Sequence, residues 1–477
     1  GVRLVGSEMC IRDRYNMIKR RDFLKKSGMI ALAAAFPGIV NAEVEATDGS
    51  AVLNKNRIKV NNQWDVIVVG GGPAGCAAAT AAAREGAKVL IIESTGALGG
   101  MGTSGLLNAW CPFTDKEKII YKGIAEKVFM EAKKGVPHAR GYDWVPINTE
   151  YLKVVYDDLV MSQGVSVLFF SNMAAIEMKN KEMVDAIIVA NKAGLTAYKA
   201  KLFIDCTGDG DLAAWAGADF DMGDDKGAVQ EGSLCFALSN IDPYEFSLIG
   251  TVQSSKKDSP IFKIIESGKY NLIKDYHIND KYAGPGYLAF NAGHVKVNSI
   301  DPASLSSAMI TGRKIARQFQ EGLAEYEPKT FASSYLAATA ALMGVRESRR
   351  IKCDYTFTLE DWLDRKEFED GIGRNSYYID VHKEDATKYP KYGKGESHGI
   401  PLRCLLPVGL KNVFVAGRCI STDHYAHGSL RVMPPALVTG EAVGTAAGLI
   451  YKAGTIDVHS IDVTRLRIRL KEMGQLL

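Results

Sequence analysis

The chain has 477 residues, of which 47% are apolar, and this is enough to bury a large core in two domains or in one domain with an inserted cap. The formal net charge of +3 comes mostly from residues 1–42, because 50 of the 58 basic and 52 of the 55 acidic side chains lie after them, a balance of −2. This near-neutral remainder has no apolar run approaching the roughly 20 residues that span a bilayer, so it favours neither a nucleic-acid nor a membrane-surface partner, nor stable membrane insertion after signal removal.

The N-terminal residues predict a leader followed by an export signal. Residues 1–16 precede Met17, a candidate initiator, and resemble the translation of a sequencing adapter, so we interpret them as non-native. From Met17, a basic region with Arg20-Arg21 precedes an apolar run of about 14 residues and small residues ending at Ala42, which is the order typical of a signal peptide. The string RRDFLK resembles a twin-arginine signal. We therefore predict a signal peptide over 17–42, a periplasmic or otherwise exported protein, and a polar linker over 43–62.

A strand, a glycine-rich turn, a helix and a second strand follow one another between residues 64 and 93. The apolar run Asp65–Val69 ends at the turn, an alanine-rich helix follows, and Lys88–Ile92 leads to Glu93. In such a unit the first glycine permits the tight turn, the second lets a pyrophosphate approach the backbone, and the third lets the helix pack on the sheet. Glu93 is placed to accept hydrogen bonds from a ribose diol. The pattern predicts a dinucleotide site, with a purely structural turn as the alternative.

The stretch after Glu93, STGALGGMGTSG, is rich in glycine a second time. Small residues allow the chain to approach a ligand closely, as wrapping a flavin and its ribityl chain requires. A nicotinamide domain usually continues here into an ordinary crossover helix. This stretch therefore favours a flavin dinucleotide.

The middle of the chain changes from helical to extended patterns and back. Helices are predicted over Ile119–Lys134 and Thr149–Gly164, and further helices around Leu305–Gly322 and Phe331–Met343. Between them, VSVLFF, AAIEMK, DAIIVA and AYKAKLFID are expected to form short strands, separated by turns at KNKEM and NKAG.

Two later segments repeat the strand-and-turn pattern. Lys201–Ala218 predicts a strand, a glycine turn and the start of a helix. Lys411–Leu449 predicts a strand over Val413–Val415, the turn Gly417-Arg418, a polar loop, and a helix opening at Pro434-Pro435, where proline suits a first helical turn.

These stretches resemble the FAD-dependent oxidoreductases of glutathione-reductase-like fold, and within them a bacterial subgroup of exported flavoproteins. The matching segments, between about Trp64 and Gly454, are VVGGGPAGCAAA, ESTGALGGMGT, FIDCTGDGDLAAWAGA, MGVRESRRI and VFVAGRCISTDHYAHGSLRVMPPALVTGEAVGTAAG. The resemblance implies an α/β fold: a Rossmann-like FAD-binding domain, with a parallel sheet and a β-meander, and an inserted α+β substrate or cap domain. We place the FAD-binding domain at 63–220 and 400–455, the cap at 221–399 and a C-terminal tail at 456–477.

The cofactor implied by the resemblance is FAD, and no metal is predicted. The residues expected to bind FAD are Gly70, Gly72, Pro73, Ala74, Gly75, Glu93, Gly99, Gly100, Met101, Thr207, Gly208, Asp209, Gly417, Arg418, Met433, Pro434 and Ala436. The helix that begins near Met433 is expected to point its N-terminus at the pyrimidine edge of the flavin, where a positive helix end favours the reduced, anionic form. An ordinary packing helix is the alternative.

The turn GDGDLAA has an alternative interpretation. Gly208-x-Gly210-x-x-Ala213 could form a second, nicotinamide-binding turn, but it lacks the following strand and ribose-binding acid. The resemblance instead places this turn beside FAD.

Candidate catalytic residues lie in the loop before the last helix, in His424-x-x-His427-x-x-x-Arg431. A histidine can exchange a proton with the substrate near neutral pH, and an arginine can hold a carboxylate. We prefer His427 as the acid or base and place His424 on the pocket wall. The HxxH spacing also suits a metal, but no third ligand is near in the sequence, and structural histidines remain an alternative.

A further candidate, Arg346, lies in the segment GVRESRRI over 344–351. Such a charged run is usually solvated. Between a predicted helix and the strand-like CDYTFTL, it could instead deliver an arginine to the flavin or the substrate.

The seven cysteines after residue 42 form no CxxC pair, and the stretch GALGGMGTSG contains none. Disulfide reductases of this fold carry a redox-active cysteine pair beside the flavin, so thiol–disulfide chemistry is not expected.

The sequence therefore predicts an FAD-dependent oxidoreductase that transfers hydride between a small organic substrate and flavin, with a separate acceptor such as a quinone or a redox protein. The alternatives are a fumarate-reductase-like C=C reductase with a carboxylate held by Arg418, Arg431 or Arg346, a non-catalytic electron-transfer subunit, and a nicotinamide-only binding module.

Overall fold

The computed structural model describes residues 58–382 and 389–477, and residues 59–477 form one compact unit. The predicted leader, signal peptide and most of the linker lie outside the described residues. The central element is a five-stranded parallel sheet in the order β17-β8-β2-β3-β4. Its strands are β2 (Val66–Val69), β3 (Val89–Ile92), β4 (Ser166–Leu168), β8 (Leu202–Asp205) and β17 (Val413–Val415). Four of the five are buried along their whole length, as their continuous apolar runs require of a parallel sheet covered on both faces.

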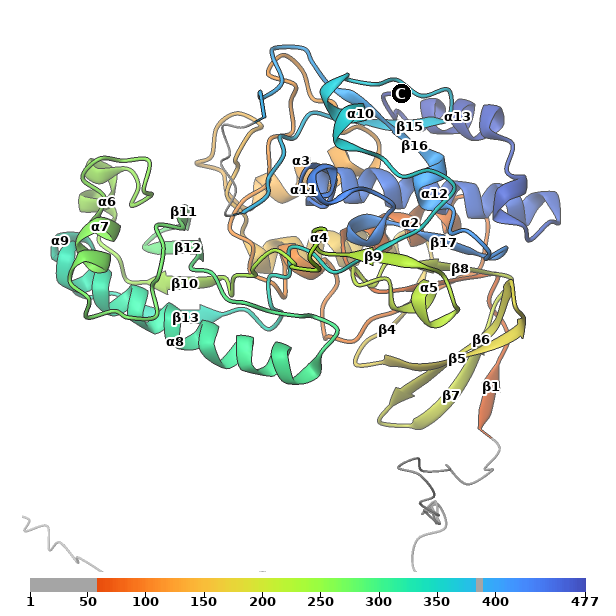
Figure 1. Ribbon diagram of the computed structural model, residues 1–477, viewed down its shortest axis with the longest axis horizontal. Helices are drawn as coiled ribbons and strands as arrows, with labels where there is room; N and C mark the ends of the chain where they lie inside the picture. The colour runs from red at the N-terminus through yellow and green to blue at the C-terminus, as the bar shows by residue number, and fades with distance from the viewer. Residues whose placement is uncertain (1–57, 383–388) are drawn as a thin grey trace, which may run out of the picture. The chain divides into compact units, whose positions relative to one another are not determined.

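Two helices, α2 (Pro73–Arg84) and α12 (Met433–Ala453), lie side by side against this sheet (Figure 1). Their contact is made by small residues. A Cβ atom on Gly440 would lie 2.1 Å from the carbonyl oxygen of Ala74, and one on Gly444 would lie 2.1 Å from that of Ala78. The helices can approach this closely only because α12 presents glycine every four residues along the facing side.

Replacing Gly444 by valine is expected to lower the free energy of unfolding by about 3 kcal/mol, the upper part of the range for overpacked cores. The clash is with backbone, so no side-chain rotation relieves it. Ala453→Val, at the exposed end of the same helix, should change the free energy by less than about 0.5 kcal/mol. Urea unfolding of both variants measures the difference, and equal stabilities would contradict the close contact between the helices.

A four-stranded sheet of order β1-β7-β6-β5 forms the meander. Its strands are β1 (Lys59–Asn61), β5 (Asn172–Asn180), β6 (Met183–Asn191) and β7 (Gly194–Lys199). Three details differ from the sequence expectation. The strand predicted at VSVLFF is β4 of the parallel sheet, the strand predicted at AYKAKLFID is divided between β7 and β8, and β1 lies inside the predicted linker and pairs with β7.

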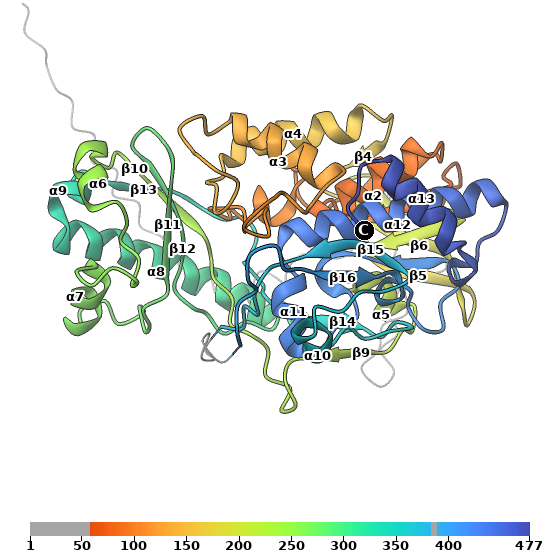
Figure 2. The ribbon, with the colours of Figure 1, turned by 90° about the horizontal axis from the view of Figure 1, so that it is seen from above.

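The cap is an antiparallel sheet of order β11-β12-β10-β13 with a long helix, α8 (Pro302–Tyr326), packed on one face (Figure 2). Its strands and shorter helices are β10 (Phe236–Ser239), β11 (Ile278–Gly284), β12 (Tyr287–Ala292), β13 (Tyr335–Thr339), α6 (Pro243–Ile249), α7 (Pro260–Glu266) and α9 (Pro328–Phe331). Phe319 of α8 stacks on Phe236 of β10, which joins the helix to the sheet.

The helix predicted around Phe331–Met343 is wrong. Helix α9 ends at Phe331, and β13 then pairs with β10 in antiparallel register. Alanine favours a helix locally, but the free edge of β10 offers backbone partners that outweigh this weak preference.

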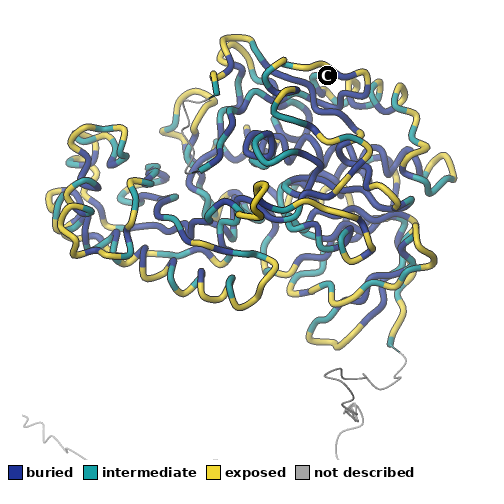
Figure 3. The backbone as a smooth tube through the Cα atoms, viewed as in Figure 1, coloured by how far each residue is buried: buried dark blue, intermediate teal, exposed yellow. Residues whose placement is uncertain are grey.

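The two hydrophobic cores divide the chain differently from the predicted boundaries. The cap core takes its buried residues from 234–343, whereas buried residues between 351 and 470 pack in the core around the parallel sheet, in the predicted FAD-binding domain. The predicted tail contains α13 (Val463–Glu472), whose Leu466 and Leu470 are buried in that same core. Figure 3 shows the buried residues, in dark blue, concentrated where Figure 1 places the parallel sheet.

The other elements are η1 (Gly100–Gly102), α3 (Ile124–Lys134), α4 (Thr149–Met161), α5 (Asp211–Trp215), β9 (Phe220–Met222), β14 (Arg349–Ile351), α10 (Leu359–Leu363), β15 (Gly371–Asn375), β16 (His398–Pro401), η2 (Leu402–Leu405), η3 (Gly417–Cys419), α11 (His424–Leu430) and η4 (Val458–Ser460). The predicted helices over 119–134 and 149–164 are confirmed as α3 and α4, with shorter bounds. In the described ranges, no helix combines the length and the apolar character that crossing a membrane requires.

Candidate functional site

A cavity of about 470 Å³ lies at the carboxyl ends of three neighbouring parallel strands, β2, β8 and β17. The turns that follow these strands all line it, together with the first turn of α12 and with cap residues. Crevices at the carboxyl ends of parallel strands are where open α/β sheets bind their ligands.

The glycines of the first turn serve two different purposes, close packing of the chain and space for a ligand. Gly70 has a φ of +95°, and a Cβ there would lie 2.3 Å from the carbonyl oxygen of Cys206. A Cβ on Gly75 would lie 1.9 Å from the carbonyl oxygen of Gly70. Both residues therefore serve chain packing. Gly72 lines the cavity, and a Cβ there would meet no protein atom within 4 Å. Its missing side chain leaves room for a ligand.

Two helix N-termini open into this cavity without a side-chain cap. Gly72 caps α2 and Val432 caps α12, and neither supplies a side-chain acceptor for the free backbone N–H groups. Such N–H groups, with the positive end of the helix dipole, bind phosphate oxygens and stabilise negative charge. The arrangement fits a dinucleotide pyrophosphate at α2 and the pyrimidine edge of a flavin at α12.

Glu93 lines the cavity at the end of β3 and is almost completely buried. Its carboxylate accepts hydrogen bonds from the backbone N–H of Gly71 and of Thr95, each at 2.7 Å. A carboxylate has about four lone-pair positions, so acceptor capacity remains for ribose hydroxyls.

The second turn, after β8, is held by buried Asp205. Its carboxylate accepts from the backbone N–H and hydroxyl of Thr207 and from the backbone N–H of Ala213, at 2.8–3.0 Å. Burial raises the pKa of Asp205 to about 6. The turn exposes Thr207, Gly208 and Asp209 to the cavity, beside the first turn, and Asp209 forms an ion pair of 2.9 Å with Arg418 of the third turn.

Most of the residues predicted to bind FAD line this one cavity, although they come from five separate segments. They are Gly70, Gly72, Pro73, Ala74, Glu93, Gly100, Met101, Thr207, Gly208, Asp209, Gly417, Arg418, Met433 and Ala436. The cavity does not include Gly75, Gly99 or Pro434. The residues present fit FAD, because the glycines open space, the helix ends are uncapped, and an acid stands at the ribose position.

Arg346 lies at the cap side of the same cavity and is 5% exposed. Its guanidinium donates to the carbonyl oxygen of Glu231 (2.7 Å) and to the hydroxyl of Ser233 (3.0 Å), and it approaches His277 Nε2 at 3.2 Å. Within 58–382 and 389–477 it forms no ion pair with an acid. Burial lowers the pKa of Arg346 to about 10.

The other arginines of the segment GVRESRRI have structural partners. Arg349 forms an ion pair of 2.7 Å with Asp211, and buried Arg350 forms one with Glu347. The segment is therefore not a solvated charge cluster, and Arg346 is the arginine it brings to the cavity.

Arg431 also lines the cavity, and it donates to the backbone and carboxylate oxygens of Asp380 at 2.9 and 3.2 Å. The predicted polar loop before it is in fact helix α11, capped by Asp423. The sequence HYAHGSL does not predict this short helix, because glycine and serine are weak helix formers.

The two histidines of α11 do not line the cavity. His427 is 1% exposed, its Nε2 lies 2.9 Å from the carbonyl oxygen of Arg418, and its Nδ1 has no hydrogen-bond partner among the described residues. Burial, with Arg350 nearby, lowers the pKa of His427 well below its usual value. His424 Nδ1 lies 2.8 Å from Glu347 Oε1. This geometry does not favour either ring as the group that exchanges a proton with the substrate.

Several cavity residues carry no sequence signal. Ser171 and Asn172 at the start of β5, Ser233 near β10, Asn291 of β12 and Leu305 of α8 line the cavity, but none belongs to a motif. Cys206 and Cys235 line it as well, and burial raises the pKa of Cys206 well above its usual value and that of Cys235 to about 12, which keeps both thiols neutral. The seven described cysteines are all free and buried.

Comparison with known proteins agrees with this geometry. The model of a family described as FAD dependent oxidoreductase matches residues 65–470. A stretch of 156 residues is 31% identical to the mitochondrial dihydrolipoyl dehydrogenase of Schizosaccharomyces pombe (strain 972 / ATCC 24843), over 31% of this chain and 29% of that protein, so this chain matches less than a third of that relative's length.

Two solved structures are similar over most of their length. A geranylgeranyl bacteriochlorophyll reductase-like protein from Thermoplasma acidophilum is 12% identical, with 87% of this chain and 89% of that chain covered and a TM-score of 0.41. The p-nitrophenol 4-monooxygenase from Pseudomonas putida DLL-E4 is 12% identical, with 87% of both chains covered and a TM-score of 0.43.

The match over residues 65–470 spans both the nucleotide turns and the cap, and it confirms the predicted fold class and the predicted cofactor, FAD. The chain belongs to the family of FAD-dependent oxidoreductases.

Proposed function

We propose that this enzyme transfers a hydride between a small anionic organic substrate and FAD, and that the electrons pass to a separate acceptor, a quinone or a redox protein. The observation that carries the proposal is Arg346, a buried guanidinium that lines the FAD cavity and forms no direct ion pair among the described residues, with Asp380 and Asp275 acting on its charge only from a distance. A buried charge without a counter-ion is costly, and an anionic ligand would offset that cost.

The cavity residues divide between the cofactor and the substrate. When bound, FAD supplies the hydride chemistry, and the protein orients the reactants and excludes water. Arg346 would hold a substrate carboxylate through its planar fork of N–H groups, with Ser233 and Asn291 as polar neighbours. Arg431 would stand on the other side, with its charge partly balanced by Asp380. His427 acts as a positioning residue, because its ring contacts the backbone of Arg418.

A C=C reductase acting on an unsaturated carboxylate is the second candidate. It is favoured by the presence of two arginines, Arg346 and Arg431, on the wall of one cavity. Family membership favours either of these activities over a non-catalytic electron-transfer subunit.

Export is part of the proposal and rests on the sequence of residues 17–42. The twin-arginine pattern with Arg20-Arg21 supports membership of an exported subgroup and an acceptor available outside the cytoplasm. Fusion of residues 17–42 to a reporter that is active only after export tests this part, and Arg20→Lys together with Arg21→Lys is expected to retain the reporter in the cytoplasm.

The direction of electron flow can be tested without knowing the natural substrate. The FAD-loaded protein is photoreduced without oxygen and mixed separately with a soluble quinone analogue, with NAD⁺, and with fumarate as a probe unsaturated dicarboxylate. We expect fast reoxidation by the quinone analogue and slow reoxidation by NAD⁺. Fast reoxidation by fumarate would instead establish the C=C reductase, and no reaction with any acceptor would contradict both candidates.

A further inference from the structure

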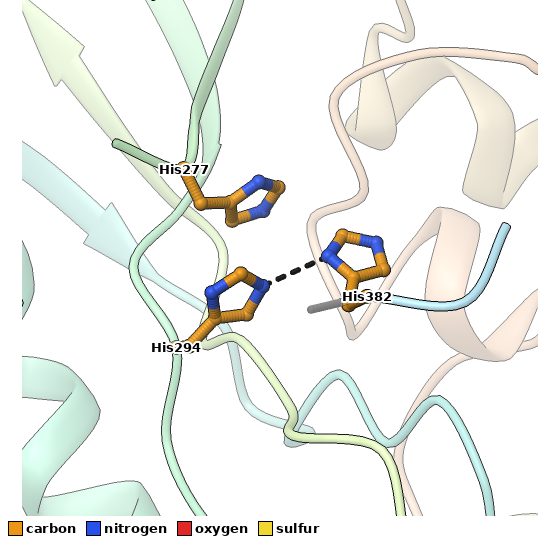
Figure 4. A group of neighbouring side chains, drawn as sticks. All are labelled: His277, His294 and His382. Carbon is orange, nitrogen blue, oxygen red and sulfur yellow. Dashed lines mark hydrogen bonds between the residues drawn. The ribbon is translucent and has the colours of Figure 1, made fainter. Parts of the chain in front are cut away.

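We propose that His277, His294 and His382 form a binding site for a divalent transition-metal ion, with Zn²⁺ the ion of first choice. Each ring offers one nitrogen atom, and these three atoms lie within 4.8 Å of one another. Figure 4 shows the three rings close together, with His277 and His294 on cap segments and His382 next to Val381, which packs in the core of the FAD-binding domain. These are not the histidines of the HxxH pattern, which does not contribute to the cluster.

The distances suit a metal after small movements. In a tetrahedral zinc site with Zn–N bonds of about 2.0–2.1 Å, the ligand nitrogens stand about 3.4 Å apart. His294 Nε2 and His382 Nδ1 are 2.8 Å apart, and the rings of His277 and His294 stack with centroids 4.3 Å apart. The planes of these two rings are only 15° apart, so their in-plane lone pairs are nearly parallel. Metal binding therefore requires the first pair to open and one of the stacked rings to rotate until both lone pairs point at the ion, in addition to shifts of about 1 Å.

Carboxylates stand behind two of the three rings. His294 Nδ1 lies 2.7 Å from Asp275 Oδ2, and His382 Nε2 lies 3.4 Å from Asp380 Oδ1. Metal-binding histidines almost always donate their second ring N–H to a carboxylate or carbonyl, which fixes the tautomer and increases the basicity of the ligand nitrogen. The two carboxylates also supply the negative charge that a divalent ion needs nearby.

The tautomers that these carboxylates favour leave a gap for a cation. With its proton on Nδ1, donated to Asp275, His294 turns the lone pair of Nε2 inward. His382 Nε2 makes an electrostatic contact of 3.4 Å with Asp380, not a hydrogen bond, and a proton on that nitrogen would turn the lone pair of Nδ1 inward. Two lone pairs 2.8 Å apart repel each other unless a cation lies between them. If His382 instead donates from Nδ1 to His294, its other lone pair faces the carboxylate of Asp380. A metal ion satisfies all four groups at once.

The charge of Arg431, which pairs with Asp380 at 3.2 Å, also acts on His382, but Arg346 opposes a metal more directly, because its Nη2 lies 3.2 Å from His277 Nε2. The guanidinium has three other acceptors, the carbonyl oxygen of Glu231, the hydroxyl of Ser233 and the amide oxygen of Asn291. It can therefore release His277 without losing all of its partners.

All-imidazole sites suit Zn²⁺, Cu²⁺, Ni²⁺ and Fe²⁺ rather than Mg²⁺ or Ca²⁺, which prefer oxygen. An ion held by three histidines would join the cap strands β11 and β12 to the segment that carries Asp380, the partner of Arg431. The site lies one side chain from the FAD cavity, since Arg346 and Asn291 contact His277 and line that cavity. A bound ion would thus set the position of both arginines.

The test uses tag-free, FAD-loaded protein that has been stripped with a chelator and dialysed to equilibrium against Zn²⁺. We expect one Zn²⁺ per chain, and we expect His294→Asn and His382→Asn each to weaken binding at least 100-fold. Asp275→Asn should weaken it about 10- to 100-fold, as carboxylates behind metal ligands do. The matched control is His459→Asn, because His459 Nδ1 also faces a carboxylate, that of Asp354 at 2.8 Å, outside the cluster.

A second readout is independent of the histidine variants. Co²⁺ added to the unmutated protein should give the visible absorption of a tetrahedral site, measured as a difference spectrum against the flavin bands, and Zn²⁺ should abolish it. Each variant is also checked for its flavin spectrum and melting temperature without metal, so that loss of folding is recognised. Absence of stoichiometric Zn²⁺ in the unmutated protein, or binding that His294→Asn and His382→Asn leave unchanged, would overturn the proposal.

Discussion

Replacing Gly72 by valine is expected to abolish FAD binding while leaving the apoprotein folded. A Cβ at this position meets no protein atom within 4 Å, and the backbone has a φ of −69° and a ψ of −176°, which any residue can adopt. The new side chain therefore enters the cavity at the uncapped start of α2, where the pyrophosphate is expected. We expect the affinity for FAD to fall at least 1000-fold, since a close backbone contact and its hydrogen bonds are lost together.

Gly284→Val is the matched control, because a Cβ on Gly284 is also free of contacts within 4 Å but lies in the cap strand β11. Fluorescence titration of both apoproteins with FAD gives the affinities, and circular dichroism reports folding. Retention of yellow protein by Gly72→Val would contradict the position assigned to the pyrophosphate. Loss of folding in this variant would contradict the open space at Gly72.

Replacing Arg346 by methionine is expected to weaken the binding of small carboxylates by about 100-fold or more. Removing one partner of a buried charged pair costs about 2–5 kcal/mol, which corresponds to a factor of about 30 to 4000. Methionine keeps the length and the apolar body of the side chain, so the cavity wall remains filled. Perturbation of the flavin absorption bands during titration with mono- and dicarboxylates measures the affinity.

Two companion variants make the Arg346 experiment specific. Arg346→Lys keeps the charge but loses the planar fork, so it should bind carboxylates with intermediate affinity. Arg403 does not line the cavity and forms an ion pair with Asp370 at 3.0 Å. Arg403→Met should therefore bind carboxylates with the same affinity as the unmutated protein. Equal affinities for Arg346→Met and the unmutated protein would show that the substrate anion is not held by this residue.

The parts of the site that could be predicted are those formed by residues adjacent in the sequence. The first turn contains strand, glycines and helix start within one short stretch, so Gly70 and Gly72 could be assigned before the fold was known. The sequence indicates Arg346 only as a candidate, from its place between a predicted helix and a strand-like segment. Its burial could not be predicted, because it depends on contacts with Ser233 and Glu231, more than 100 residues earlier in the chain.

The parts that could not be predicted depend on contacts between distant segments. Nothing near His277, His294 or His382 in the sequence links them, and they meet only because β11 and β12 pair and the chain returns past the cap. The same reason explains β13. Its alanine residues favour a helix locally, but the segment pairs with the edge of β10, which is distant in the sequence. The sequence favours His427 because it lies close to the start of α12, but α11 turns its ring into the core.

The close contact between α2 and α12 also affects when FAD can bind during synthesis of the chain. Ala74 emerges from the ribosome hundreds of residues before Gly440, yet the two are in direct contact, and the third cofactor turn and the second open helix end both lie after residue 410. A nascent chain that has emerged only as far as the first βαβ unit, which ends at β3, still lacks β4, β8 and β17 of the parallel sheet and the N-terminus of α12. We therefore expect FAD to bind only late in biosynthesis, and a ribosome-stalled chain ending before α12 to remain colourless.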